Sequence, residues 1–577
     1  MNARKRSRTI VPSFVIALIV TLLLAACAVP AAPVAEAPAA APAAAEATAA
    51  PEPEPTAVPE AESGEASTLT FATESPWGTY SPFRPTYQYG YSSNFPAMLT
   101  HSRLFDLDRN NVPHPDLALE WEVSDDATTY TFHLREDAKW HDGKPVTARD
   151  VEATVKFIMT KETNINPQRW ISSLVGGQEF YDGVSEELPG VQVPDDFTVI
   201  FQLTEPKVGW HLSATTDLQI LPAHIFENVA PGDVVEHHAP AWYTPELNIG
   251  SGPFKFVQAE RDQFIELVRN EEYYGGVPQV ERILFKNFGT PDTQFIALQK
   301  GELDVWKVPQ DFYEQALGLD NVNVQLVNRN YIRVFLLNYE SDKLSDKRVR
   351  QALAYAIDRE GICEVLYSGL CQPYNSYMEM RPWLAPDLNQ YEYNPEKAQE
   401  LLDAAIADGT WDPNNELTVN WYYGDALHQD IMAAIQQNLA AVGVKTVLQF
   451  LEGTSVAAAA ANCEYDLLYQ GWGFAFPEDY NSFFTDGERC TSPWGDEEAR
   501  ALFNQTAATV DEDERRAIHN QLQTRLNDEL PMMPFLQFTG PLAINKRVSG
   551  FDEDAQWNQY YLWNNGYANA VNWSVSE

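Results

Sequence analysis

The sequence predicts an α/β protein built from more than one compact part. Residues 117–159 have the pattern of a strand, a turn and a helix, and residues 345–451 repeat helices followed by strands. Helices that alternate with strands are typical of a largely covered sheet. About 510 residues follow an N-terminal leader and tether, and a chain of that length exceeds one ordinary core. We therefore expect two or three subdomains.

The prediction for residues 117–159 depends on residue spacing. Tyr130, Phe132 and Leu134 alternate with polar residues, which is the period of a strand with one buried face. Asp142-Gly143 then supplies a turn. A helix should follow, because capping-box residues precede an apolar face at helical spacing. These residues are Thr147, Asp150, Val151, Val155 and Ile158.

A longer motif in this region resembles a known family. The run WEVSDDATTYTFHLREDAKWHDGKPVTARDV, which begins at Trp121, is similar to the signature of the peptide-type (family 5) solute-binding proteins of ABC transporters. This is the family of dipeptide- and oligopeptide-binding proteins. Residues 250–286, GSGPFKFVQAERDQFIELVRNEEYYGGVPQVERILFK, resemble a second stretch of the same family, and residues 292–305 resemble the helix and strand entry that follow it.

The resemblance implies a two-lobed clamp of the periplasmic-binding-protein type (type II, large peptide-binding class), with an extra subdomain in lobe I. It places lobe I at residues 68–328, lobe II at 329–534 and a return to lobe I at 535–577. The segment 328–337 then lies at the hinge. Two crossing segments between lobes favour a hinged clamp over a rigid block.

Helix signals recur through the predicted lobe II. Ser345 and Asp358 stand where N-caps are expected, and Asn394-Pro395-Glu396 combines a cap with a first-turn proline and acid. A strand is expected at Val444–Leu451. Two further apolar faces at helical spacing are Ile431, Ile435, Leu439 and Val442, and then Ile518, Leu522 and Leu526.

The N-terminus has the features of an export signal, residues 1–26. Basic residues precede an apolar run, Val11–Ala26, which is shorter than the roughly 20 residues that span a membrane. Leu24-Ala25-Ala26-Cys27 resembles the bacterial lipobox, which implies that Cys27 becomes the lipidated first residue. Residues 27–67, rich in Ala, Pro and Glu, should form a disordered tether. We expect an exported protein, lipid-anchored at the outer face of the bacterial cytoplasmic membrane, in the periplasm or at the cell surface.

The chain is strongly acidic, with a formal net charge of −43. An acidic body repels phosphate backbones and anionic lipid head groups, which argues against nucleic acid or a peripheral membrane patch as partners. We interpret the charge as a solvated surface and not as a selector of cationic ligands. We expect a monomer.

Four cysteines besides Cys27 should form disulfides, because disulfides are typical of exported proteins. Four thiols allow three connectivities, and pairing by neighbourhood favours Cys363 with Cys371 and Cys463 with Cys490. No spacing of cysteine and histidine is typical of a zinc site, so we expect neither a metal nor a cofactor.

The segment Gln470–Tyr480 follows a predicted strand and is the main candidate for ligand binding. Strand ends that face an interlobe crevice are the usual ligand position in α/β domains. In the resembling family, a Gly-Trp pair here precedes an acidic loop whose aspartate holds the ligand's α-amino group. Gly471-Trp472 matches, but the acidic continuation is replaced, and Asp479 is the candidate that remains. The candidate ligand-binding residues are Trp77, Tyr80, Arg381, Trp383, Gly471, Trp472, Gly473, Phe474, Asp479 and Tyr480.

Three functions are compatible with these features. The first is a substrate-binding lipoprotein that captures peptides for an ABC importer, with the permease and ATPase subunits as partners. The second keeps the fold but binds oligosaccharides, since Trp77, Trp170, Trp383 and Trp472 could stack on sugar rings. The third is a secreted hydrolase, whose pair of carboxylates would leave no motif. Because the sequence has no catalytic motif, we expect a binding protein and not an enzyme.

Overall fold

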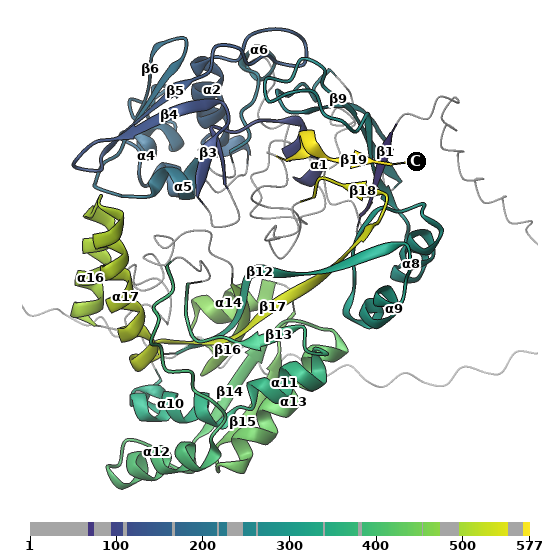
Figure 1. Cartoon of the computed structure of the whole chain (residues 1–577). Helices are drawn as coiled ribbons and strands as arrows, with labels where there is room; N and C mark the ends of the chain where they lie inside the picture. The colour runs from purple at the N-terminus through teal and green to yellow at the C-terminus, as the bar shows by residue number, and fades with distance from the viewer. Residues whose placement is uncertain are drawn as a thin grey trace, which may run out of the picture. The chain divides into compact units, whose positions relative to one another are not determined.

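The computed structural model describes residues 67–73, 94–107, 112–163, 168–215, 218–227, 246–260, 263–338, 341–378, 383–452, 454–472, 496–551 and 569–576 (Figure 1). All of them lie in one compact unit that spans residues 62–577. The expected signal, 1–26, and all of the expected tether except Ser67 lie outside the described residues. In the part of the chain that is described, no helix is long and apolar enough to cross a membrane.

A mixed sheet of eleven strands forms the centre of the molecule, which confirms the predicted α/β class. Its order is β15-β14-β16-β12-β17-β11-β1-β10-β9-β8, and β13 pairs with β17 beside this path. The strands are β1 (Thr68–Thr73), β8 (Phe254–Glu260), β9 (Phe264–Arg269), β10 (Arg282–Asn287), β11 (Val305–Lys307), β12 (Val322–Leu337), β13 (Cys371–Pro373), β14 (Glu416–Trp421), β15 (Lys445–Phe450), β16 (Leu467–Trp472) and β17 (Met532–Asn545).

The two long strands β12 and β17 are the segments that cross between the lobes, and they run side by side in Figure 1. Their antiparallel ladder extends from Val322, opposite Asn545, to Leu336, opposite Met532. The register shifts between Asn328 and Ile332, where residues 329–331 lie opposite Phe538 alone. Such a bulge interrupts pairing and bends a strand. It lies inside the segment expected to form the hinge, while the lobe boundaries at 328 and 534 stay predictions.

Lobe I is built on the parallel pair β1 and β10, extended by the antiparallel strands β9 and β8. The motif of residues 250–286 forms these three later strands. The core of this lobe combines aliphatic with aromatic side chains, among which Phe71 and Phe285 stack at a ring distance of 5.2 Å. The further elements of this lobe are α1 (Asn94–Thr100), α8 (Pro291–Lys300), η5 (Gln310–Phe312), α9 (Tyr313–Leu317), β18 (Val548–Ser549), η9 (Ala570–Asn572) and β19 (Ser574–Val575).

A four-stranded antiparallel sheet, in the order β4-β5-β7-β6, forms the separate subdomain. Tyr130 and Phe132 of β5 are fully buried, as their alternation predicted, and the Thr147–Asp150 capping box begins α2. The elements around it are β2 (Phe105–Leu107), β3 (Pro113–Pro115), β4 (Ala118–Val123), β5 (Thr129–Leu134), α2 (Ala148–Ile158), η3 (Lys161–Thr163), α3 (Gln168–Ile171), α4 (Gly177–Tyr181), β6 (Val191–Asp195), β7 (Thr198–Gln202), α5 (Trp210–Thr215) and α6 (Ala223–Phe226).

Lobe II alternates helices with strands around β14, β15 and β16. Asp358 and Asn394 cap their helices as predicted, whereas the prediction for Ser345 is wrong by one residue. Asp346 is the N-cap, because its carboxylate accepts the N–H of Arg348 and a short 3-10 turn ends at Leu344. The helical segments are η6 (Asp342–Leu344), α10 (Lys347–Ala356), α11 (Arg359–Leu366), α12 (Pro395–Ala407), α13 (Ala426–Ala441), α14 (Thr454–Ala461), α16 (Glu497–Ala508) and α17 (Glu512–Glu529).

The structure joins Cys363 and Cys371 in a disulfide between α11 and β13. Cys463 is also disulfide-bonded, and Cys490 lies outside the described residues. These bonds add covalent constraints to lobe II, which restrict its unfolded chain.

A buried carboxylate, Asp304, ties together three strands of lobe I. Its oxygens accept a hydrogen bond from the backbone N–H of Thr70 at 2.9 Å. They also accept bidentate hydrogen bonds from Arg547, from Nε at 2.7 Å and from Nη2 at 2.8 Å. Asp304 is fully buried, while the Arg547 side chain is 37% exposed. The pair therefore fixes the start of β11 against β1 and the end of β17.

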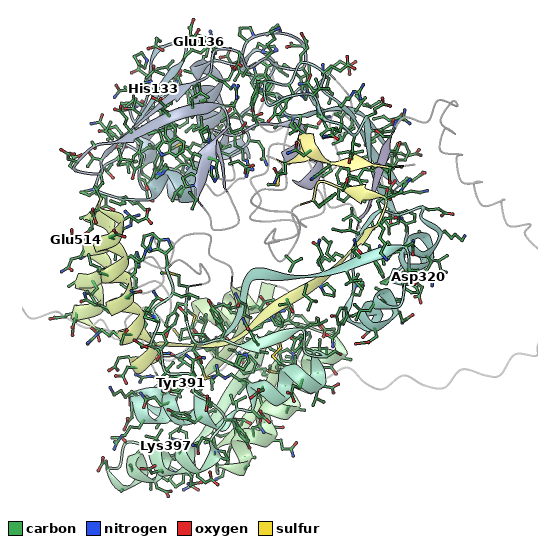
Figure 2. All side chains as sticks on the ribbon, in the orientation of Figure 1. His133, Glu136, Asp320, Tyr391, Lys397 and Glu514 are labelled. Carbon is green, nitrogen blue, oxygen red and sulfur yellow. A yellow bond between two sulfur atoms is a disulfide. The ribbon has the colours of Figure 1, made fainter. Side chains whose placement is uncertain are left out.

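We predict that Asp304→Ala destabilises the protein by about 2–4 kcal/mol. The change removes the acceptor of the Thr70 N–H and the carboxylate that pairs with Arg547. Because Arg547 keeps access to water, the loss of stability stays below that expected for a fully buried pair. Urea unfolding of both proteins measures the difference. Asp320→Ala is the control, since Asp320 is exposed nearby (labelled in Figure 2) and should change stability by less than about 0.5 kcal/mol. Equal effects of the two substitutions would contradict this account.

Candidate functional site

Two parallel strands of lobe II, β14 and β16, end at the same edge of the sheet. β14 leads into the turn 422–425, and β16 ends at Gly471 and Trp472. β12 crosses this edge antiparallel to β16, with Arg333 opposite Gly471. Ligands of open α/β sheets bind outside the carboxyl ends of the strands. This edge is therefore the candidate functional site.

A buried arginine is the centre of the site. Arg333 is 9% exposed, and its Cζ atom lies 3.9 Å from the centre of the Tyr423 ring. Its Nη1 donates to the Tyr423 hydroxyl at 2.6 Å, and Tyr422 and Tyr423 contact each other through their hydroxyls at 2.9 Å. The guanidinium thus has a stacked aromatic face and a polar edge, which is an arrangement that holds a cation in a partly apolar environment.

His428 is held between Arg333 and Asp425. Arg333 Nη2 lies 3.3 Å from His428 Nε2, and because a guanidinium only donates, Nε2 must accept. The ring proton is therefore on Nδ1, which lies 2.8 Å from each carboxylate oxygen of Asp425. Asp425 also caps α13 by accepting the backbone N–H of His428. The hydrogen bonds that the His428 ring makes with Arg333 and Asp425 therefore fix the imidazole in one tautomer.

The electrostatics of the site keep this histidine neutral. Burial, and then the positive charge of Arg333, lower the pKa of His428, although Asp425 acts in the opposite direction. Burial alone would raise the pKa of Asp425, but the hydrogen bonds from His428 leave that pKa below its ordinary value. The site therefore holds one persistent cation, Arg333, and a carboxylate at its rim.

Two further aromatic residues enclose the guanidinium. The Arg333 Cζ atom lies 5.4 Å from the ring centre of Phe538 on β17 and 5.8 Å from that of Tyr469 on β16. We call Arg333, Tyr423, His428, Tyr469 and Phe538 the Arg333 cluster. It combines residues of β12, β16 and β17 with the segment after β14, so both crossing strands contribute to the site.

Most of the predicted ligand-binding residues lie outside the described part of the chain. Gly471 is described and is paired with Arg333 in the sheet, and of Trp472 only the backbone is described. The roles of these residues stay predictions. Those outside the described residues are Trp77, Tyr80, Arg381, Gly473, Phe474, Asp479 and Tyr480.

Trp383 is described and is buried, 7% exposed. Its ring meets His519 edge to face at 5.4 Å, and Arg515 and Arg516 lie over it at 5.2 and 5.4 Å. Trp170, considered as a sugar platform, is a core residue of the subdomain, packed against Phe201 and Trp210. The structure thus places these two tryptophans in packed surroundings, away from the Arg333 cluster.

Sequence reasoning missed Arg333, Tyr423 and His428. One signal was present, since Arg333 is a charged residue inside the otherwise apolar strand Ile332–Leu337, where charged residues are rarely buried without partners. No pattern linked it to the Tyr-Tyr-Gly-Asp turn, which is some ninety positions further along the chain. Among the described residues, no group of three or more histidine, cysteine or acidic side chains could hold a metal ion.

Comparison with known proteins identifies relatives over most of the chain. The family described as bacterial extracellular solute-binding proteins, family 5, middle part, matches residues 112–489. The dipeptide-binding protein of Escherichia coli K12 is 28% identical over 522 residues, which is 86% of this chain and 94% of that protein. A Brucella ovis protein with the provisional name ABC transporter peptide-binding protein is 32% identical over 343 residues, 58% of this chain and 59% of its own length.

Solved structures have the same fold. A substrate-binding protein of an ABC transporter from Listeria monocytogenes superimposes with a TM-score of 0.73 at 23% identity, covering 89% of this chain and all of that one. At this identity the likeness establishes the fold. It confirms the predicted two-lobed architecture.

We predict that His428 makes the protein less stable as the pH falls from about 7 to 5. Its pKa is lowered in the folded state, so below its ordinary value near 6.5 the unfolded chain binds a proton that the folded site excludes. Its contribution to stability should decline by up to about 1.4 kcal/mol per pH unit. His428→Gln removes this contribution, so the stability advantage of the wild type should shrink as the pH falls.

Urea unfolding at pH 7, 6 and 5 measures both proteins. The other buried histidines whose pKa is lowered are common to both proteins and cancel in the difference. They are His101, His141, His211 and His519. A difference that does not change with pH would show that His428 is not the titrating group.

Proposed function

The chain belongs to the family 5 bacterial extracellular solute-binding proteins, and from this premise we propose that it captures peptides between its two lobes and delivers them to the permease of an ABC importer. The observation that carries the proposal is the extent of the family match. Residues 112–489 include the subdomain, most of lobe II and every member of the Arg333 cluster except Phe538. The names of the relatives support peptides as the ligand class.

The Arg333 cluster supports a specific role in this function, the recognition of a carboxylate. A guanidinium and a carboxylate form short, charge-assisted hydrogen bonds that neutral pairs do not match. Tyr423 stacks on Arg333 and fixes its plane, while His428 adds no competing positive charge. We therefore assign the C-terminal carboxylate of the peptide, or an acidic side chain, to Arg333.

The remaining ligand contacts are proposed from the sequence. Asp479 would pair with the α-amino group, and Trp472 and Phe474 would contact apolar side chains. Gly471 would let a ligand approach the backbone beside Arg333, because glycine has no side chain there. With a cation for the carboxylate and an anion for the amine, the ligand would be held at both ends.

Closure follows from contacts on both lobes. A ligand shifts an equilibrium between open and closed forms only by as much as it binds one form better than the other. A peptide that contacts lobe I and lobe II together gains its full set of contacts in the closed form. The permease would then recognise the closed, loaded protein.

The cellular context belongs to the same proposal. Export by the signal 1–26, a lipid anchor on Cys27 and the tether 27–67 would keep a monomer beside the permease and its ATPase subunits, outside the cytoplasmic membrane. Anchoring of this kind needs more than one acyl chain, since a single chain binds membranes reversibly. The relatives reported above are binding proteins, which supports a function without catalysis.

We predict that the protein binds di- to pentapeptides and not cello- or xylo-oligosaccharides. Isothermal titration calorimetry with both ligand classes measures this directly, and the sequence-based alternatives predict different outcomes. Binding heat with sugars but not with peptides would contradict the proposed peptide binding and favour the oligosaccharide alternative. Release of product from a peptide or a sugar on prolonged incubation would favour the hydrolase.

We predict further that Arg333→Gln weakens binding of peptides with a free C-terminus by roughly 10- to 100-fold, the range expected for loss of a hydrogen bond to a charged group. The matched ligand is the same peptide with an amidated C-terminus. The wild type should discriminate between the two, and the variant should not. Arg500→Gln, an exposed change on α16, is the control and should bind as the wild type does. Unchanged discrimination in Arg333→Gln would show that Arg333 does not bind the C-terminal carboxylate.

A further inference from the structure

A short loop in lobe II is closed on itself by a disulfide. Cys363, on α11, is bonded to Cys371, the first residue of β13, with their Cα atoms 5.2 Å apart. We call residues 363–371 the disulfide loop. β13 pairs with β17 from Cys371, opposite Phe538, to Pro373, opposite Leu536. The loop is thus attached to one of the two crossing strands.

The backbone of the disulfide loop is tightly folded. The N–H of Gly369 donates to the carbonyl of Cys363 at 2.9 Å, and the N–H of Thr539 on β17 donates to the carbonyl of Leu370 at 2.9 Å. Ser368 has a φ of +53°, a left-handed conformation that residues other than glycine rarely adopt. Such a conformation persists only when its surroundings hold it in place. The disulfide and the β17 contact supply that constraint.

A side chain of lobe I contacts this loop. Gln310, in η5, donates from Nε2 to the carbonyl of Leu366 at 2.6 Å and lies 3.4 Å from the hydroxyl of Ser368. Its neighbour Phe312 packs against Phe295 and Trp306 at ring distances of 5.6 and 5.7 Å. Gln310 therefore belongs to a segment packed on the core of lobe I, while its side chain contacts lobe II.

The same loop also contacts the surroundings of the candidate site. The ring of Tyr367 lies 5.0 Å from that of Phe538, and the guanidinium of Arg333 lies 5.4 Å from the Phe538 ring. Phe538 is also the residue opposite the bulge 329–331 of β12. A series of contacts therefore runs from Gln310 to Leu366 and Ser368, along the backbone to Tyr367 between them, and from the Tyr367 ring through Phe538 to Arg333.

We propose that the disulfide loop is a mechanical link between lobe I and the Arg333 cluster, so that movement of the lobes changes the packing of Phe538 and the position of Arg333. Gln310 and Tyr367 are positioning residues in this proposal, and the disulfide keeps the loop stiff enough to transmit displacement. The coupling between the lobes does not depend on the ligand. Its effect on ligand affinity rests on the proposed function.

Gln310→Met tests the link in ligand-free protein, because methionine keeps the length of the side chain and removes the amide donor. We expect amide hydrogen exchange to become roughly two- to tenfold faster, the factor that corresponds to one ordinary hydrogen bond, both in residues 366–370 and in residues 420–428 of the site. Gln315→Met is the matched control, since Gln315 donates to Asp311 within its own lobe. It should leave both segments unchanged.

Faster exchange confined to residues 366–370, or the same response in the control, would overturn the proposal. Such a result would make the Gln310 contact a local one, because physical proximity alone does not establish coupling between sites.

A double-mutant cycle tests the role of the disulfide. Cys363→Ser/Cys371→Ser should also accelerate exchange in residues 420–428, and Gln310→Met should add little on that background because the loosened loop no longer transmits displacement. Additive effects would contradict a shared route. If the cysteine variant does not fold, the exchange rates of Gln310→Met and Gln315→Met still test the proposed link.

Calorimetry with the peptides named above gives the second readout, in which Gln310→Met should lower affinity by a similar two- to tenfold factor. No peptide binding even in the wild type would refute the proposed function, while the exchange experiment would still test the link.

Discussion

The paired strands β12 and β17 are the constraint on which the rest of the structure depends. Their ladder begins in lobe I at Val322 and Asn545 and ends in lobe II at Leu336 and Met532. Both strands belong to the larger sheet, and β17 is buried at almost every position, so their register cannot slip by one residue without moving every side chain to the opposite face. Movement of the lobes about the predicted hinge would therefore preserve the direction of each side chain on these strands.

Each lobe also has a buried charged side chain that ties several segments together. Asp304 holds three strands of lobe I through Thr70 and Arg547. In lobe II, buried Arg359 donates to the carbonyl groups of Tyr374, Gln390 and Tyr391 and to the side chain of Asn375 (Tyr391 is labelled in Figure 2). Burial lowers the pKa of Arg359 to about 10, which still leaves it charged at neutral pH. Polar groups satisfied in this way specify one packing arrangement.

The Arg333 cluster follows a different principle, because its cation is enclosed largely by aromatic rings. Taking a guanidinium out of water is costly, and a well-packed apolar residue would often give a more stable protein. Contact with the ring of Tyr423 and the hydrogen bonds to Tyr423 and His428 offset part of that cost. Because the strand that carries this cation also joins the lobes, the proposed ligand contact lies in the segment predicted to form the hinge.

From residue patterns alone we could predict the local elements and the α/β class, and the resemblance of the sequence motifs to family 5 proteins implied the two-lobed architecture. Signals such as the Thr147–Asp150 capping box and the alternation through Tyr130 and Phe132 act over a few residues, so they can be read without knowing the fold. The helix cap predicted at Ser345 belongs to Asp346 because neighbouring candidates compete for the same backbone N–H groups. Only the tertiary structure brought Arg333 to Tyr423, His428 and Phe538, and set Gln310 against the disulfide loop. These contacts join positions far apart in the chain and depend on sheet order and register, which leave no periodic trace in the sequence.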